Sequence, residues 1–338
     1  MRIILAEEKK NLTINDIARE LGVSKTTISR AMSGKGRIGE ETRKKVNAYI
    51  LAHGYQPSVI AKGLAQSRTF NICVLLPEDN YLQDMPFFQK ALLGISEYLS
   101  GADYDAIITT GAEHNIENLK RIVTNKKVDG VILTRTVRND PAVTFLMEKE
   151  LPFAVIGLYE ESKVIQVDAK HEEAVCELTR YLLGKGLKRI ALLGGNPEHI
   201  VNQKRFLGVR QAYHMMKTDE KYLTLYENMN SESDITRAVQ DVLYGGCDCI
   251  LCGDDRITIS VLNKLRRANV AVPEEMRIAT LFESIILDHY VPAITGLTYD
   301  VMQLGRIAAQ QLLSMIQGNK VPALTTLDYQ IVIRESTR

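Results

Sequence analysis

From Phe70 onward, short apolar runs alternate with helix-like segments. The runs read NICVLLP, DAIITTG, VDGVILT, FAVIGL, RIALLGG and CDCILCG. This alternation is typical of βαβ units, in which a helix carries the chain back so that the next strand lies parallel to the last. We therefore predict an α/β body with parallel sheets. Ligands of such sheets bind beyond the carboxyl ends of the strands.

Residues 13–32 have the pattern of two short helices joined by a tight turn. Thr13 and Asp16 stand at capping-box spacing, and the apolar residues after Thr13 recur at helical spacing. Gly22 ends the first helix and Ser24 caps the second. A third helix is predicted over 40–53. Two short helices with a glycine-containing turn make a helix-turn-helix.

The second helix of this pattern has one polar face. Ile28 and Met32 are four residues apart and would point inward, which leaves outside the side chains of Lys25, Thr26, Ser29 and Arg30. Lys and Arg can donate to guanine O6 and N7 in the major groove, so Lys25 and Arg30 are the leading base readers. A small helical bundle with a solvated charged face would explain the same pattern without DNA.

Positive charge is concentrated in this head. Residues 1–68 hold 13 Lys and Arg against 6 Asp and Glu, a charge of +7, whereas the rest of the chain carries −6. A basic segment indicates a polyanionic partner, although a solvated surface would look the same on charge alone.

Long segments of the chain resemble the lac repressor family of LacI/GalR-type regulators. The resemblance lies in TINDIARELGVSKTTISRAMSGKGRIGEETRKKV, LAHGYQPSVIAKGLAQSRTFNICVLLP, VDAKHEEAVCELTRYLLGKGLKRIALLGG, RFLGVRQAY and LCGDDRITISVLNKLRRANVAVPEE. It implies a sequence-specific transcriptional repressor with a helix-turn-helix domain over 1–56, a hinge helix and linker over 57–69, and an effector-binding and dimerisation domain over 70–338.

The resemblance also implies a role for individual residues of the head. The residues implied to contact bases are Lys25, Thr26 and Arg30. The residues implied to contact phosphates are Thr13, Ser24, Thr27, Ser29 and Arg37. Leu64 matches the leucine that enters the minor groove as an apolar wedge, and two such wedges imply a homodimer on a pseudo-palindromic operator. The hinge departs from the family pattern in having Ala61-Lys62-Gly63 before this leucine.

For the body, the resemblance implies a two-lobed, type I periplasmic-binding-protein-like fold. The chain should cross between the lobes near Val167, Pro292 and Thr325. The N-lobe would then hold about 70–166 and 293–324, and the C-lobe about 167–292 and 325–338. No heptad tail follows the last predicted strand, so we expect a dimer rather than a tetramer.

Several polar residues end the predicted strands and would face the cleft between the lobes. Arg205 matches the arginine that holds an effector's polar groups, and Asp254 and Asp255 match an Asn-Asp pair. The full predicted effector site is Asp79, Phe87, Phe88, Thr134, Arg205, Asp254, Asp255 and Phe282. We expect a small-molecule effector, with a sugar or sugar phosphate favoured. A structural ion pair is the alternative explanation of Asp255 and needs no ligand.

One departure from the family pattern concerns the effector. In IATLFES, Phe282 stands where the family usually has an aspartate that contacts the effector. The change removes a hydroxyl-binding carboxylate, so the effector would be less sugar-like, carry a ring that stacks, or be absent.

Other classes of protein fit the sequence less well. Cys247, Cys249 and Cys252 invite a zinc interpretation, but a strand would scatter them over two faces, so we expect no metal. The glycine fingerprint of a dinucleotide site and a nucleophile elbow are both missing, so no cofactor and no enzyme activity are expected. A solute-binding protein is the rival class; the N-terminus lacks a signal peptide's apolar region. Five cysteines without a disulfide pattern and the lack of a long apolar run indicate a cytoplasmic protein with no membrane partner.

Overall fold

The helical head is the first of two units into which the chain divides, residues 1–69 and 70–338. The computed structural model describes residues 12–33, 37–55, 63, 66–78, 86–112, 115–160 and 164–338. The head contains α1 (Ile14–Leu21), α2 (Lys25–Ser33) and α3 (Glu40–His53). Their buried core consists of Ile17, Ala18, Ile28, Ala31 and Val46. The predicted three helices are confirmed.

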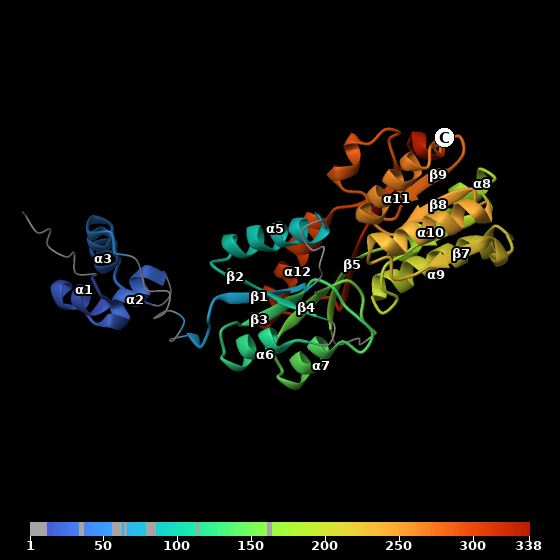
Figure 1. Ribbon diagram of the computed structural model, residues 1–338. Helices are drawn as coiled ribbons and strands as arrows, with labels where there is room; N and C mark the ends of the chain where they lie inside the picture. Colours follow the sequence, from blue (N-terminus) through green and yellow to red (C-terminus); the bar gives the residue numbers. More distant parts are fainter. Residues whose placement is uncertain are drawn as a thin grey trace, which may run out of the picture. The chain divides into compact units, whose positions relative to one another are not determined.

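The second unit contains two six-stranded sheets (Figure 1). The N-lobe sheet has the order β11-β5-β4-β3-β1-β2, and all its strands are parallel. Its strands are β1 (Asn71–Pro77), β2 (Asp105–Gly111), β3 (Gly130–Leu133), β4 (Phe153–Ile156), β5 (Ile165–Ala169) and β11 (Leu324–Leu327).

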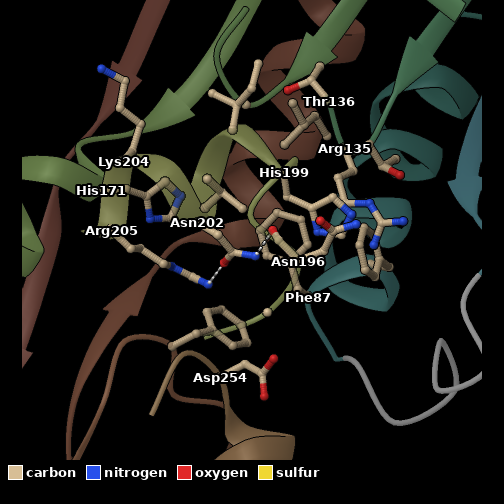
Figure 2. A pocket seen from close by; sticks show the side chains of 18 of the residues that line it. Phe87, Arg135, Thr136, His171, Asn196, His199, Asn202, Lys204, Arg205 and Asp254 are labelled. Carbon is tan, nitrogen blue, oxygen red and sulfur yellow. Dashed lines mark hydrogen bonds between the residues drawn. The ribbon is translucent and has the colours of Figure 1, made fainter. Parts of the chain in front are cut away.

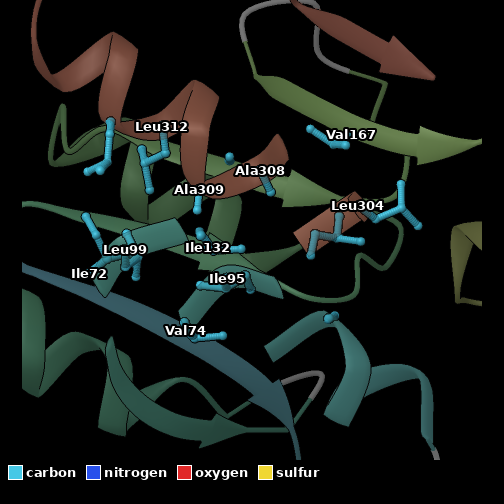
Figure 3. Close-up of a cluster of buried hydrophobic side chains, with 14 of the residues drawn as sticks. Ile72, Val74, Ile95, Leu99, Ile132, Val167, Leu304, Ala308, Ala309 and Leu312 are labelled. Atoms are coloured by element: carbon cyan, nitrogen blue, oxygen red, sulfur yellow. The ribbon is translucent and has the colours of Figure 1, made fainter. Parts of the chain in front are cut away.

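Helices cover both faces of the N-lobe sheet (Figure 1). On one face lie α5 (Pro86–Gly101) and α12 (Val301–Ile316), and on the other α6 (Glu117–Thr124) and α7 (Pro141–Glu148). Figure 3 shows the core under α5 and α12, where Ile95 and Leu304 meet strand residues such as Ile132. Burial on both faces explains why these strands are apolar throughout rather than alternating.

The close contact of α5 with α12 depends on two glycines. A Cβ on Gly94 would lie 1.9 Å from the carbonyl oxygen of Met302, and one on Gly305 would lie 2.1 Å from that of Ala91. No side chain fits at such distances, so the two helices can approach this closely only because both positions are glycine.

The C-lobe sheet has the order β12-β10-β9-β8-β6-β7. Its strands are β6 (Ile190–Leu193), β7 (Leu223–Tyr226), β8 (Cys249–Cys252), β9 (Arg277–Thr280), β10 (Thr295–Tyr299) and β12 (Tyr329–Val332). Only β12 among these runs antiparallel to its neighbour, β10. One face packs on α8 (His171–Gly184) and α9 (Ile200–Met215), the other on α10 (Glu232–Gly245) and α11 (Asp255–Arg267). Short 3-10 helices lie at Glu220–Tyr222, Ile285–His289 and Glu335–Thr337.

The chain passes from one sheet to the other after β5, after β10 and after β11, near Lys170, Asp300 and Asp328. The first and last crossings lie a few residues beyond the predicted positions. The prediction of a crossing near Pro292 is wrong, because β10 pairs with β9 and β12 and so belongs to the C-lobe. The apolar pattern of β10 would suit either sheet, which is why the sequence did not separate them.

Candidate functional site

The first two helices of the head begin with side-chain caps. The hydroxyl of Thr13 donates to Asp16 Oδ2 at 2.6 Å, and the Asp16 amide donates back to Thr13 Oγ1 at 3.4 Å. The Thr27 amide donates to Ser24 Oγ at 3.1 Å. Gly22 lies between the two helices with a φ of 63°, a conformation that costs glycine little. These contacts fix the turn that sets α2 against α1.

Helix α2 presents its polar side chains outward. Lys25, Thr26, Ser29 and Arg30 are exposed, while Ile28 and Ala31 are buried. The prediction that Ile28 points inward is therefore confirmed, and Met32 is partly buried against the same core. Ser24, Thr13 and Arg37 are also exposed, and Thr27 is half-buried. Leu64, the predicted minor-groove wedge, lies outside the described residues.

A cavity of about 350 Å³ lies between the two sheets of the body. Seven predicted effector residues line it: Phe87, Phe88, Thr134, Arg205, Asp254, Asp255 and Phe282. Asp79 lies outside the described residues. These residues come together because α5, α9, the loop after β3, the start of α11 and the loop after β9 meet near the carboxyl ends of the strands.

Arg205 lies on the inner side of the cavity, on α9 (Figure 2). Its Nη1 donates to Asn202 Oδ1 at 3.3 Å, and Asn202 in turn donates to the carbonyl oxygen of Asn196 at 2.9 Å. Arg205 Nε is shielded from solvent and has no hydrogen-bond partner among the described residues. Burial lowers the pKa of Arg205, and the nearby Tyr299, Asp254, Asp168 and Asp255 oppose that shift.

Asp254 and Asp255 already have partners within the protein. Asp254 is the N-cap of α11 and accepts from the Ile257 amide at 2.8 Å. Asp255 accepts from the hydroxyl of Ser284 and from the Arg256 amide. Burial raises the pKa of Asp255 to about 6. No ion pair of Asp255 occurs within the part of the chain that the structure describes, so its charge has no cation partner at contact distance.

Two further wall residues, Asp168 and His171, were missed by sequence reasoning. Asp168 is at the end of β5 and 5% exposed, and its Oδ1 lies 3.5 Å from Nε2 of His171, the first residue of α8. Burial raises the pKa of Asp168 to about 7 and lowers that of His171 to about 3. Tyr299 packs against His171 with ring centroids 4.7 Å apart. The sequence signal that could have indicated these two residues is the run of polar residues where the chain crosses between the lobes.

Additional polar residues also line the cavity. They come from the loops after β1, β3, β6 and β7, from the start of α9 and from α11: Glu78, Arg135, Thr136, Asn196, His199, Asn202, Lys204, Asn230 and Arg256. Lys204 is paired with Glu172 at 3.0 Å. The hydroxyl of Thr134 donates to the carbonyl oxygen of Leu75 at 2.8 Å. Its proton is therefore already used in a hydrogen bond within the N-lobe.

The lobes touch each other at the cavity. The rings of Phe87, on α5, and Phe282, after β9, meet edge to face with centroids 5.8 Å apart. Backbone contacts form what we call the interlobe bridge: the Val137–His199 β-bridge, with the Ile200 amide donating to Thr136 O at 3.3 Å. Phe282 is 5% exposed and packs into the N-lobe core, so it does not offer an open ring face for stacking.

The cysteines and the helices give little further chemistry. Cys249 and Cys252 lie in β8, as the predicted strand required, and all five cysteines are unbridged. Among the residues described, no three His, Cys, Asp or Glu side chains gather as a metal site. No helix in those ranges has the length and apolar character needed to span a membrane.

Comparison with known proteins adds independent evidence. Residues 13–58 match the model for bacterial regulatory proteins of the lacI family, and residues 179–337 match that for a periplasmic binding protein-like domain. The HTH-type transcriptional regulator MalR of Streptococcus pneumoniae is 28% identical over 316 residues, which is 91% of this chain and 94% of MalR.

Solved structures agree on the fold over nearly the whole chain. The transcriptional regulator CelR in complex with cellobiose is 25% identical, with a TM-score of 0.72 over 96% of this chain and 99% of that one. The lac repressor dimer bound to operator and the anti-inducer ONPF has a TM-score of 0.81 at 19% identity, over 97% and 99% of the two chains. The helix-turn-helix head, the two-lobed body and these matches show that the chain belongs to the lacI family and is a DNA-binding transcriptional regulator.

Proposed function

We propose that this regulator represses transcription by binding an operator as a homodimer, and that a small effector in the interlobe cavity controls the binding. The observation that carries the DNA part is the exposed polar face of α2, next to buried Ile28 and Ala31. A rigid helix with an outward polar face can enter a major groove without unfolding the head.

Lys25, Thr26 and Arg30 are the proposed base readers, because their side chains are all exposed on α2 and can donate to base edges in the major groove. Phosphate contacts are assigned to residues at the helix starts and in the flanking loop, where short hydroxyls and a cation suit phosphate oxygens. These are Thr13, Ser24, Thr27, Ser29 and Arg37. Leu64 is proposed as the wedge at the centre of the operator, one from each protomer.

The effector site is proposed to be the cavity lined by Phe87, Arg205 and Asp254, with Phe88, Thr134, Asp255 and Phe282 in its wall. Asp79, which lies outside the described residues, stays part of the proposed site from the resemblance alone. CelR was solved with cellobiose, and a carbohydrate-related effector fits a cavity that combines aromatic rings with charged groups. Binding would change the relative position of the lobes and, through the chain entering the N-lobe at Phe70, the head.

Homodimerisation through the body is supported by exposed apolar side chains on both lobes. Leu93 is 61% exposed on α5, Ile108 lies on the edge strand β2, and Ile285 and Val291 project from the C-lobe. A subunit contact that covers these side chains would remove their apolar surface from water. We further propose that the protein acts in the cytoplasm, where its unbridged cysteines stay reduced, and that it catalyses no reaction.

Selection of random duplex DNA by the purified full-length protein tests the proposal, repeated with sugars, sugar phosphates and purines. Enrichment of a palindrome, with loss or gain of enrichment in the presence of one compound, is the expected result. The variant Arg30→Ala should change the enriched motif, whereas Lys44→Ala, an exposed change on α3, should not. Absence of any enriched sequence at low salt would contradict the proposal.

A further inference from the structure

A second cavity, of about 250 Å³, lies in the C-lobe between α9 and the sheet. It adjoins the interlobe cavity, with which it shares Gly195, Asn202 and Arg205. We propose that this second cavity, which we call the α9 cavity, binds a hydrophobic α-amino acid. The side chain of the amino acid enters the cavity, and its carboxylate and ammonium groups lie at the mouth against Arg138 and Glu227.

The inner surface of the α9 cavity is apolar. Leu192 of β6 and Leu281 after β9 are buried, and Leu225 of β7 is half-buried. Helix α9 contributes Phe206 and Leu207. An apolar cavity of about 150 Å³ is enough to hold benzene. The larger α9 cavity therefore has room for the side chain of leucine or phenylalanine.

Water inside the α9 cavity would find few side chains to bind. The amide nitrogen of Gln203 already donates to the carbonyl oxygen of Pro197 at 2.7 Å. The amide nitrogen of Asn202 donates to the carbonyl oxygen of Asn196 at 2.9 Å, and its oxygen accepts from Arg205 at 3.3 Å. Buried water normally makes about three hydrogen bonds to polar groups. An apolar side chain therefore displaces water from this cavity at little cost.

Two oppositely charged side chains line the mouth of the α9 cavity. Arg138 comes from the loop between β3 and α7, Glu227 comes from the loop after β7, and both are exposed. Neither forms an ion pair within the ranges that the structure describes. A guanidinium binds a carboxylate through two parallel hydrogen bonds, and a carboxylate attracts an ammonium. A zwitterion satisfies both residues, whereas a simple anion or cation meets one partner and one like charge.

The α9 cavity takes its wall from both lobes. Arg138 belongs to the N-lobe and follows Val137 of the interlobe bridge, and its amide donates to the carbonyl oxygen of Glu198 at 3.1 Å. The apolar part of the wall belongs to the C-lobe. A ligand that contacts Arg138 and this apolar wall together stabilises the arrangement in which the lobes touch. The amino acid would thus change how readily the interlobe cavity opens.

Calorimetry and thermal shift on the full-length protein test the class of ligand. The probes are L-leucine, L-phenylalanine and glycine, together with the deaminated and decarboxylated analogues of the first two. We expect L-leucine or L-phenylalanine to bind at least about tenfold more tightly than glycine and than either of its own analogues. Glycine isolates the contribution of the apolar side chain, and each analogue isolates one of the two charges.

Variants test the position of the site. Leu225→Phe fills the cavity and should weaken binding at least about tenfold. Thr224→Phe places a ring on the other, exposed face of β7 and should leave binding unchanged. Arg138→Gln should remove the preference over the decarboxylated analogue, and Glu227→Gln the preference over the deaminated one. Arg210→Gln, at an exposed arginine of α9 paired with Glu220, is the control for the charge changes.

Circular dichroism establishes that each variant is folded, and the changes at exposed Arg138 and Glu227 keep the test decisive if Leu225→Phe is not. Equal binding of glycine or of an analogue, binding unaffected by these variants, or no response to either amino acid at millimolar concentration overturns the proposal. DNA selection with the same unmodified protein reports on the proposed function separately, because it needs no amino acid to show an enriched sequence.

Discussion

Phe282 of the C-lobe meets Phe87 of the N-lobe edge to face, with ring centroids 5.8 Å apart, and it does so at the wall of the ligand cavity. Phe282 follows β9 of the C-lobe in the chain, but its side chain packs in the hydrophobic core of the N-lobe. The residue therefore links two bodies that must move relative to each other if an effector is to control the head.

Phe282→Ala should destabilise the body by about 3–5 kcal/mol, because it removes a buried ring and leaves space between the lobes. Denaturant unfolding followed by circular dichroism measures this loss. Leu207→Ala, at a 43% exposed position on α9, serves as the control and should have a small effect. A double-mutant cycle with Phe87→Ala should give a coupling of about 0.5–1.5 kcal/mol. Strict additivity would show that the two rings act independently.

Lys25→Ala and Arg30→Ala should relax the base preference of the head, because each removes donors from the exposed face of α2. Each loss of a base contact is expected to reduce discrimination by about 1–3 kcal/mol. Competition binding between the selected operator and single-base variants measures it. Phosphate-contact variants such as Arg37→Ala should weaken all sequences alike, so a motif change in Arg37→Ala rather than in Arg30→Ala would reverse the assignments.

Asp168 should make the folded body less stable as the pH rises toward neutrality. Its pKa is raised to about 7 in the fold, so the folded protein retains a proton that the unfolded chain releases above about pH 4. The contribution is therefore present at low pH and lost as the pH rises through 7.

His171, Lys204, Arg205 and Tyr299 are the titratable groups around Asp168. The pKa of His171 is lowered to about 3, so its opposing contribution is complete by about pH 6.5. Between about pH 6 and pH 8, Asp168→Asn should flatten the decline of the melting temperature. An unchanged slope in this variant would exclude Asp168 as its cause.

Gly94→Ala should destabilise the N-lobe strongly, because its Cβ would lie 1.9 Å from the backbone oxygen of Met302 and only a shift of α12 could relieve that. Overpacking of this kind costs about 1–3 kcal/mol or more. Gly101→Ala, at the end of the same helix and with open space around it, provides the control. Equal melting temperatures for the two variants would show that α5 and α12 separate easily.

The sequence predicted the fold well where local pattern decides it. The caps at Thr13 and Ser24, the inward Ile28 and the alternation of strands and helices are all short-range features. It failed at β10, where the choice of sheet depends on pairing with β9 and β12, which lie in separate parts of the chain.

The candidate site shows the same division. Arg205 and Asp254 stand in recognisable motifs and could be predicted, and both line the cavity. For Asp168 and His171 the sequence offered only a polar run at a crossing between lobes, because their burial and mutual contact arise only when β5, α8 and α9 come together. Phe282 was predicted as a ligand contact, and its packing into the opposite lobe depends on the closure of the two lobes.

The interlobe bridge of Val137 and His199 joins the loop before α7 to the loop before α9, while the three chain crossings join the same lobes elsewhere. A ligand that leaves the cavity by parting the lobes must first break the backbone hydrogen bonds of that bridge. Exchange of the effector would then proceed at the rate of lobe opening rather than at the rate of diffusion. Such opening takes microseconds to milliseconds, so the dissociation rate of an effector would report how readily this bridge breaks.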